Sequence, residues 1–167
     1  MAAERNGGTA VCPGSYDPVT LGHVDIISRT AHVFDQVVVG VVDQPVRKKG
    51  TLFSAEERVA FLETELGKLG NVQVKAFDTL LVEFARENGA KAIVKGLRAI
   101  SDFEYEFEMN QLNRKMAPDI ESLYLFSAPQ FSFLSSSGVK ELAMFGGDLT
   151  GLVPPDVATR LQEALKR

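Results

Sequence analysis

The 167-residue sequence contains one cysteine, two histidines and no tryptophan. A single thiol, Cys12, excludes an intramolecular disulfide, as is usual for a protein of a reducing cytoplasm. No apolar run approaches the roughly 20 residues of a membrane-spanning helix. The segment from Met1 to Gly8 also lacks the apolar centre of a signal peptide. We therefore expect a cytoplasmic protein with no membrane partner.

Positive charge is also limited, because 18 Lys and Arg residues stand against 22 Asp and Glu residues and give a formal net charge of −4. A protein whose main partner is a nucleic acid is more often basic, so we expect no nucleic-acid partner. A local basic cluster can still hold phosphates in an acidic protein. The sequence has no internal repeat, low-complexity segment or linker. Its length predicts one domain over residues 1–167, with residues 1–8 as a loose extension.

Strand and helix patterns alternate along the chain. Strands are predicted at residues 9–12, 36–42, 72–77, 92–94 and 122–126. Helices are predicted at 24–34, 55–66, 79–88, 101–116, 138–145 and 155–166, and the second and fourth open on capping-box sequences that begin at Ser54 and Ser101. Five strands that alternate with helices predict an α/β fold. We expect a Rossmann-like, doubly wound, five-stranded parallel sheet with helices on both faces.

Unusual polar segments follow four of the predicted strands. Residues 14–23 follow the first strand, 47–49 the second, 95–98 the fourth and 131–137 the fifth. Ligands of doubly wound sheets bind at the carboxyl ends of the strands, where the strand order reverses. We therefore expect these four segments to converge on one site.

The first of these segments, Pro13–His23, is a strand–turn–helix connection that presents backbone N–H groups and a helix N-terminus to an anion. Gly22 leaves room for a close approach beside His23, which lies at the predicted helix start. The alternative interpretation is an ordinary βα turn in which His23 caps the helix or is solvated. A dinucleotide-binding fingerprint is excluded, because no G-x-G-x-x-G follows the strand.

The other segments carry cations and hydroxyls. Lys95 and Arg98 flank a glycine and could grip phosphate, or form a solvated turn. The serines of residues 132–137 precede a helix, where they suit either phosphate binding or simple N-capping. The basic run 47–49 is either a substrate contact or a solvated loop. No metal-ligand cluster surrounds Asp17 in the sequence.

Four motifs together carry a family resemblance: Gly-Ser-Tyr-Asp-Pro-Val-Thr-Leu-Gly-His, Lys-Gly-Leu-Arg, Asp-Phe-Glu-Tyr-Glu and Phe-Ser-Phe-Leu-Ser-Ser-Ser. In order and spacing, from Thr9 onward, the chain resembles the bacterial phosphopantetheine adenylyltransferases of the nucleotidyltransferase superfamily. The resemblance implies transfer of AMP from ATP to 4'-phosphopantetheine, which gives dephospho-CoA and pyrophosphate. It also implies Mg²⁺ as cofactor and a homohexamer built as a dimer of trimers.

The resemblance further implies roles for individual positions, and it assigns no metal ligand. His23 and Arg98 would be catalytic, with His23 stabilising the transition state. The acceptor site would comprise Ser15, Arg47, Leu81 and Lys95. The ATP site would comprise Ser15, Tyr16, His23, Gly96, Leu97, Arg98, Glu106, Phe131, Ser132, Phe133, Leu134, Ser135, Ser136 and Ser137.

Four positions depart from the family pattern. Ser15 stands where threonine is also common, and Gly138 where a larger residue is usual. Arg47 stands where lysine is usual, and Lys48 is the alternative for that role. Lys95 replaces a frequent arginine, which keeps the charge and loses the two-pronged geometry.

Two other functions remain open on the sequence alone. One is an adenylyltransferase or cytidylyltransferase for another small phosphate acceptor, such as nicotinamide mononucleotide. The other is a nucleotide-binding sensor without catalysis, although His23 would add little to adenine recognition. We favour phosphopantetheine, because no tryptophan or paired aromatics lie around Leu81 to stack a nicotinamide ring. An acceptor that is already a phosphate also needs no obvious catalytic base.

Overall fold

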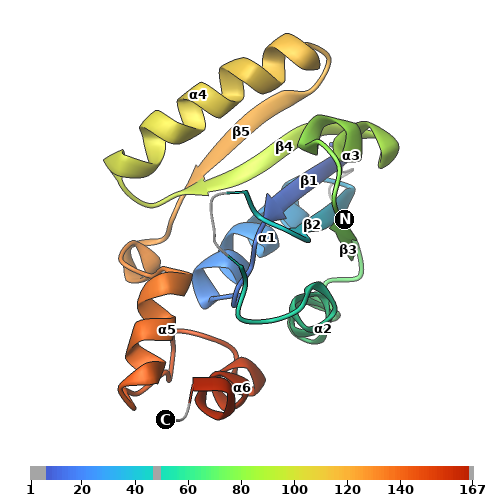
Figure 1. Ribbon diagram of the computed structural model, residues 1–167. Coiled ribbons are helices and arrows are strands. Elements are labelled where there is room, and N and C mark those ends of the chain that lie inside the picture. The colour runs from blue at the N-terminus through green and yellow to red at the C-terminus, as the bar shows by residue number, and fades with distance from the viewer. Residues whose placement is uncertain (1–6, 47–49, 166–167) are drawn as a thin grey trace.

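A five-stranded parallel sheet forms the centre of the computed structural model, which describes residues 7–46 and 50–165 (Figure 1). The strands are β1 (Thr9–Gly14), β2 (Gln36–Val42), β3 (Val72–Phe77), β4 (Ala90–Leu97) and β5 (Glu121–Phe126), in the order β3-β2-β1-β4-β5. The helices are α1 (Leu21–Val33), α2 (Ala55–Leu66), α3 (Leu81–Glu87), α4 (Ile100–Met116), η1 (Pro129–Phe131), α5 (Ser136–Met144) and α6 (Pro155–Leu165). The predicted fold class is confirmed.

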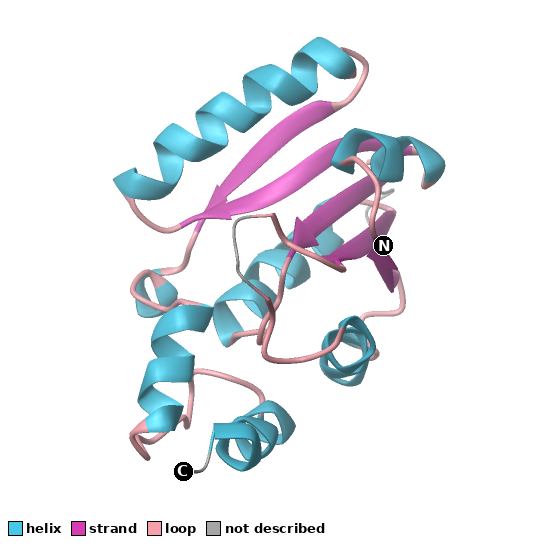
Figure 2. Cartoon of the chain, viewed as in Figure 1, coloured by secondary structure: helices cyan, strands magenta, loops and turns pink. Residues whose placement is uncertain are grey.

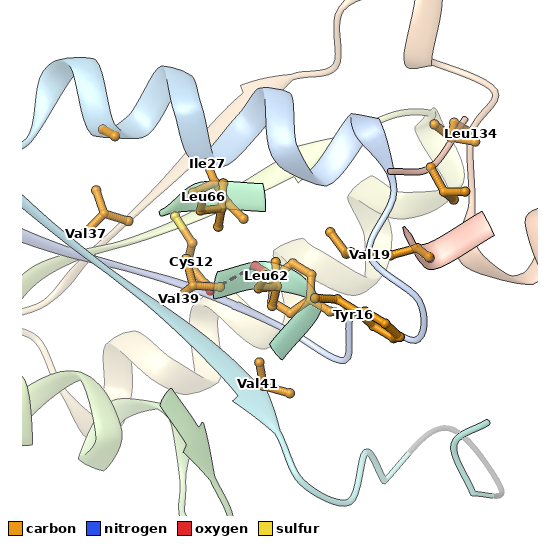
Figure 3. Close-up of a cluster of buried hydrophobic side chains, with 14 of the residues drawn as sticks. Cys12, Tyr16, Val19, Ile27, Val37, Val39, Val41, Leu62, Leu66 and Leu134 are labelled. Carbon is orange, nitrogen blue, oxygen red and sulfur yellow. Dashed lines mark hydrogen bonds between the residues drawn. The ribbon is translucent and has the colours of Figure 1, made fainter. Parts of the chain in front are cut away.

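Helices cover both faces of the sheet because its strands are apolar on both sides (Figure 2). In β1, Ala10 and Cys12 face the layer formed by α1, α2, α5 and α6, whereas Val11 faces the layer that contains α3. The first of these layers forms the larger cluster, part of which is drawn in Figure 3. The alternation follows from the two-residue period of a strand.

The structure moves several predicted boundaries. Helix α1 begins at Leu21 rather than residue 24, since Thr20 is its N-cap, and α5 begins at Ser136 rather than 138. Strand β4 extends through Leu97, so residues 95–97 belong to the strand instead of following it. Helix α4 begins at Ile100 after an N-cap at Ala99, so the capping box predicted at residue 101 is wrong.

The start of the described chain is tied to the sheet. The carbonyl oxygen of Gly8 accepts hydrogen bonds from the backbone N–H groups of Asp35 and Gln36, and its own N–H donates to the Asp35 carboxylate. Residues 1–6 lie outside the described part. No helix within that part is long and apolar enough to cross a membrane.

Candidate active site

A cavity of about 510 Å³ opens where β1 and β4 separate. The two strands pair from Thr9 to Val11 of β1, and this pairing ends at Val11 and Ile93. Beyond that point β1 continues beside β2, whereas β4 continues beside β5 as far as Leu97 (Figure 1). The cavity therefore lies at the predicted reversal of strand order, and the carboxyl ends of both strands line it.

The turn after β1 is shaped by an inward-facing tyrosine. Tyr16 has a left-handed backbone conformation, with φ 48°, and its buried hydroxyl donates a hydrogen bond to the carbonyl oxygen of Cys12 at 2.9 Å (Figure 3). A Cβ atom at Gly14 would lie 2.9 Å from the Tyr16 ring, so only glycine lets the ring fold back here. Burial, followed by the neighbouring Cys12, raises the pKa of Tyr16 well above its ordinary value.

His23 is held in one orientation at the start of α1. Its Nδ1 atom accepts a hydrogen bond from the backbone N–H of Thr20 at 3.0 Å, and the Thr20 hydroxyl accepts from the His23 backbone N–H. The Tyr16 ring packs against the imidazole edge-on, with the ring centres 5.0 Å apart. Because Nδ1 is an acceptor, the neutral ring carries its proton on Nε2. These hydrogen bonds make His23 a helix-capping residue, and its side chain also lines the cavity.

Asp17 is a fully buried carboxylate in the same turn. It accepts hydrogen bonds from the backbone N–H groups of Leu52 and Phe53 at 2.9 and 3.0 Å. Lys140 of α5 lies 3.0 Å from the same carboxylate. Burial alone would raise the pKa of Asp17, but these two hydrogen bonds and the ammonium group lower it below its ordinary value. Asp17 is therefore charged and holds three chain segments together.

Arg58 of α2 is a fully buried cation that binds the ends of β1 and β2. Its guanidinium donates to the carbonyl oxygens of Ser15, Val42 and Asp43 at 2.8 Å each. Its Nε atom donates to the carbonyl oxygen of Phe53 at 3.1 Å. A planar fork with five donors suits such a set of backbone oxygens, which lysine could not satisfy.

Two cations at the end of β4 form ion pairs with carboxylates of α4, and all four residues line the cavity. The Lys95 ammonium lies 2.9 Å from a Glu106 carboxylate oxygen. The Arg98 guanidinium contacts Asp102 at 3.3 Å and donates to the carbonyl oxygen of Leu134 at 2.8 Å. Asp102 and Glu106 lie one helical turn apart on α4, which places both carboxylates on one helix face.

The N-terminus of α5 faces the same cavity. Ser135 is the N-cap, and its hydroxyl accepts a hydrogen bond from the backbone N–H of Gly138 at 3.1 Å. Ser136 donates to the carbonyl oxygen of Pro18 at 2.8 Å, which joins α5 to the turn after β1. The cavity thus receives two helix N-termini, those of α1 and α5, together with the imidazole and the two cations. This combination suits a ligand with several phosphates.

The comparisons with known proteins agree with this geometry. The family model described as cytidylyltransferase-like matches residues 11–142. A protein of Clostridium tetani named phosphopantetheine adenylyltransferase is 53% identical over 148 residues, which cover 89% of this chain and 91% of that protein. A protein of the same name from Rubrobacter xylanophilus is 51% identical over 158 residues, or 95% of each chain.

The chain belongs to the phosphopantetheine adenylyltransferases of the cytidylyltransferase-like family.

Solved structures of lower sequence identity share the fold of this phosphopantetheine adenylyltransferase family member. A nicotinic acid mononucleotide adenylyltransferase from Plasmodium falciparum, complexed with NaAD, has a TM-score of 0.69 at 13% identity and covers 94% of this chain and 95% of that chain. A putative nicotinate-nucleotide adenylyltransferase from Vibrio parahaemolyticus has a TM-score of 0.64 at 18% identity and covers 95% of this chain and 94% of that chain. At these identities the likeness shows the fold alone.

The structure brings most of the predicted site residues together. The residues around the cavity include Ser15, Tyr16, His23, Lys95, Gly96, Arg98, Glu106, Phe131, Leu134, Ser135, Ser136 and Ser137.

Four predicted site residues do not line this cavity, and a fifth has no described position. Leu97, Ser132 and Phe133 do not line the cavity, and the Phe133 side chain is 73% exposed. Leu81 begins α3 and packs against the apolar cluster on the other face of the sheet. Arg47, with its alternative Lys48, lies outside the described residues. The cavity described here therefore covers the phosphate-binding side better than the predicted acceptor side.

The structural roles of Asp17, Arg58 and Lys140 were not predicted from the sequence. Lys140 lies one turn into α5 and pairs with Asp17. A signal for Arg58 does exist in the sequence. It occupies the buried stripe of α2 between Ala55 and Leu62, where an apolar residue is usual. An arginine on an apolar stripe indicates a buried polar partner, though not which one.

Proposed function

We propose that this protein transfers the adenylyl group of ATP to 4'-phosphopantetheine and releases dephospho-CoA and pyrophosphate. The observation that carries the proposal is the identity of about half of all positions, over most of both chains, to proteins named phosphopantetheine adenylyltransferase. The cavity supports it with the chemistry that a nucleoside triphosphate needs, since two helix N-termini and two cations surround it.

The reaction is an in-line displacement at the α-phosphorus of ATP. An oxygen of the acceptor phosphate forms the new bond, and the bond from the α-phosphorus to the oxygen that bridges to the β-phosphate breaks. The acceptor is anionic near neutral pH, so no side chain has to remove a proton. Negative charge moves toward the departing pyrophosphate, and catalysis rests on positioning and on stabilising that charge.

His23 is the residue best prepared to stabilise this charge. Its Nδ1 is engaged by the backbone N–H of Thr20, and its ring is fixed against Tyr16. With Nδ1 as the acceptor, the neutral ring can donate from Nε2 to a phosphoryl oxygen without a change of tautomer. A donor that is fixed before the reaction needs no reorganisation when charge develops.

The ATP phosphates would contact Arg98 and the N-terminus of α5. Arg98 already bridges to the loop before α5 through the carbonyl oxygen of Leu134, so one cation is held next to the serines 135–137. Glu106 and Gly96 also line the cavity and complete the side proposed for the nucleotide. The hydroxyls and N–H groups of the helix start offer neutral donors, which complement the single charge of Arg98.

The acceptor phosphate would contact Lys95, which also lines the cavity. Lys95 is paired with Glu106 in the structure, so an acceptor would share or replace that carboxylate. Ser15, in the turn after β1, would contact both substrates. Leu81 and Arg47 remain proposed contacts on the family resemblance alone.

Magnesium is proposed to arrive as a component of the ATP substrate. Among residues 7–46 and 50–165, no three His, Cys, Asp or Glu side chains are grouped so that they could hold a metal ion. Mg²⁺ is commonly bound by substrate phosphates and water with few protein ligands. Bound to the triphosphate, it would neutralise part of the charge that the protein's own donors then orient.

A homohexamer, built as a dimer of trimers in the cytoplasm, is also proposed. Its support is a set of exposed apolar side chains on α4 and β5, two elements that lie together at one edge of the molecule (Figure 1). Exposed apolar patches commonly mark contacts between proteins. The contributing side chains are Phe103, Phe107, Leu112, Met116, Leu123 and Phe126. Light scattering should give a mass near six chains, and a monomer at micromolar concentration would contradict the assembly.

The activity is tested with a panel of acceptors. The purified protein is incubated with Mg–ATP and either 4'-phosphopantetheine, nicotinamide mononucleotide or no acceptor, and released pyrophosphate is measured. We expect release with phosphopantetheine alone. Release with nicotinamide mononucleotide but not with phosphopantetheine would overturn the acceptor and leave the nucleotidyltransferase assignment intact. ATP binding without release on any acceptor would instead support a sensor.

A further inference from the structure

The turn after β1 and α5 are joined by an ion pair whose carboxylate is fully buried. Asp17 is fully buried, and the Nζ atom of Lys140 lies 3.0 Å from its carboxylate. The two residues are 123 positions apart in the sequence. A second link, from the Ser136 hydroxyl to the carbonyl oxygen of Pro18, joins the same two segments. The two segments therefore meet at two points.

Both joined segments carry groups that line the cavity, but Lys140 does not line it. On one side the turn provides Ser15 and the helix start that bears His23, and on the other α5 provides its serine N-terminus. Any ligand whose phosphates contact both segments depends on their spacing. Lys140 can affect such a ligand only through the position of these segments.

The backbone hydrogen bonds of Asp17 do not set this spacing. The N–H groups of Leu52 and Phe53 fix the carboxylate from the side of the segment before α2. Lys140 lies one turn into α5, and its ammonium group links that helix to Asp17. Without Lys140, the carboxylate keeps its backbone donors, and α5 loses one of its two links to the turn after β1.

From this geometry, and resting on the adenylyl transfer proposed above, we infer that Lys140 is a positioning residue. Through Asp17 it fixes the N-terminus of α5 against the turn after β1, at the separation that the ATP phosphates require. A misplacement of about 1 Å away from the reacting atoms can lower a rate by about 10²-fold. The ion pair is thus a determinant of ATP binding and turnover, apart from its contribution to stability.

The test compares Lys140→Met with Lys140→Arg, which keeps the charge. For Lys140→Met we expect ATP affinity, measured by titration calorimetry without acceptor, to fall about tenfold, and kcat to fall about 10- to 100-fold. The KM for 4'-phosphopantetheine should change less than ATP affinity, because Lys95 and Leu81 lie on other segments and only Ser15 of its proposed contacts lies in the joined turn. Lys140→Arg should recover most of both losses. Amide hydrogen exchange should rise at residues 19–22 and 135–139 in Lys140→Met only.

Arg86→Met is the matched control. Arg86 also makes a 3.0 Å ion pair between distant segments, with Asp119, but it lies on α3 away from the cavity. We expect ATP affinity and kcat to stay within about twofold of the parent protein in this variant. If Lys140→Met does not fold, Lys140→Gln takes its place and is judged by the same values.

Three results would overturn the inference. They are unchanged ATP affinity and kcat in Lys140→Met, equal losses in Lys140→Arg, or equal losses in Arg86→Met. Failure of the proposed function looks different. If the parent protein binds ATP but does not adenylylate phosphopantetheine, the activity proposal fails, and ATP affinity still decides the role of Lys140. A parent protein that does not bind ATP overturns both.

Discussion

Replacing His23 separates the two contributions of its imidazole. His23→Ala removes the Nδ1 acceptor of the part-buried Thr20 N–H, which is bonded at 3.0 Å. One such hydrogen bond contributes about 1 kcal/mol to the free energy of unfolding, and in a chain of this length that lowers Tm by about 2–4 °C. The variant also removes the proposed Nε2 donor. Loss of one donor to a developing charge lowers kcat by about 10²–10³, or about 2.7–4 kcal/mol.

The catalytic loss in His23→Ala should therefore be larger than the loss of stability. Pyrophosphate release at saturating substrates gives kcat, thermal unfolding gives Tm, and titration calorimetry gives ATP affinity. We expect ATP affinity to weaken by a smaller factor than kcat, since the contact strengthens in the transition state.

Helix α2 provides a matched control for the capping effect. Ser54 and Glu57 form a capping box of the same kind, outside the cavity. Ser54→Ala should cost about 1 kcal/mol of stability and leave kcat unchanged. The proposed role of His23 would be refuted by a His23→Ala protein with kcat within about threefold of the parent. It would also be refuted by a comparable loss of kcat in Ser54→Ala, which would trace the effect to helix capping.

Three further predictions concern Lys95, Asp17 and Cys12. Lys95→Ala should raise the KM for 4'-phosphopantetheine more than that for ATP, and steady-state kinetics showing the reverse would place Lys95 on the nucleotide side. The Asp17 pKa is lower in the folded protein than its ordinary value, so its stabilisation is present above about pH 4 and is lost as pH falls through the folded value. Urea unfolding at pH 5 and pH 3 should show this loss, and Asp17→Asn should show a smaller one. Burial, only partly offset by a hydrogen bond with Thr30, raises the pKa of Cys12 to about 12. Iodoacetamide at pH 8 should leave the folded protein unmodified by mass spectrometry, and modification without unfolding would contradict this burial.

The fold could be predicted because local patterns dominate it. The continuous β-branched run of β2 allows only a strand that is covered on both faces, and its residues do divide between the two apolar clusters. The capping box at Ser54 likewise predicted the start of α2 correctly. The box predicted at residue 101 has the same S-x-x-E pattern, but this prediction is wrong because α4 already begins at Ile100. The sequence motif alone could not distinguish the N-cap position from a place within the first turn.

The arrangement of the site depended on contacts between distant segments, which the sequence shows only in part. Its location followed from topology, since β1 and β4 had to separate at the reversal of strand order. The partners of Arg58 were not predictable, because its acceptors are backbone carbonyl oxygens, and every residue has one of these. The capping bond of His23 was left as an alternative to a functional role. The structure shows that the bond exists, and the bond orients the ring that the proposed mechanism uses.

The two cations at the end of β4 also have partners that could not be predicted from the sequence, and these partners affect how phosphates bind. Lys95 and Arg98 are positive in the sequence, yet Glu106 and Asp102 neutralise them from α4 in the structure. A phosphate that enters must therefore exchange with a carboxylate or share its cation, so a single phosphate gains little. A triphosphate together with an acceptor phosphate can engage both cations and the two helix N-termini at once. The carboxylates of α4 thereby favour binding of the triphosphate and the acceptor phosphate together over binding of either one alone.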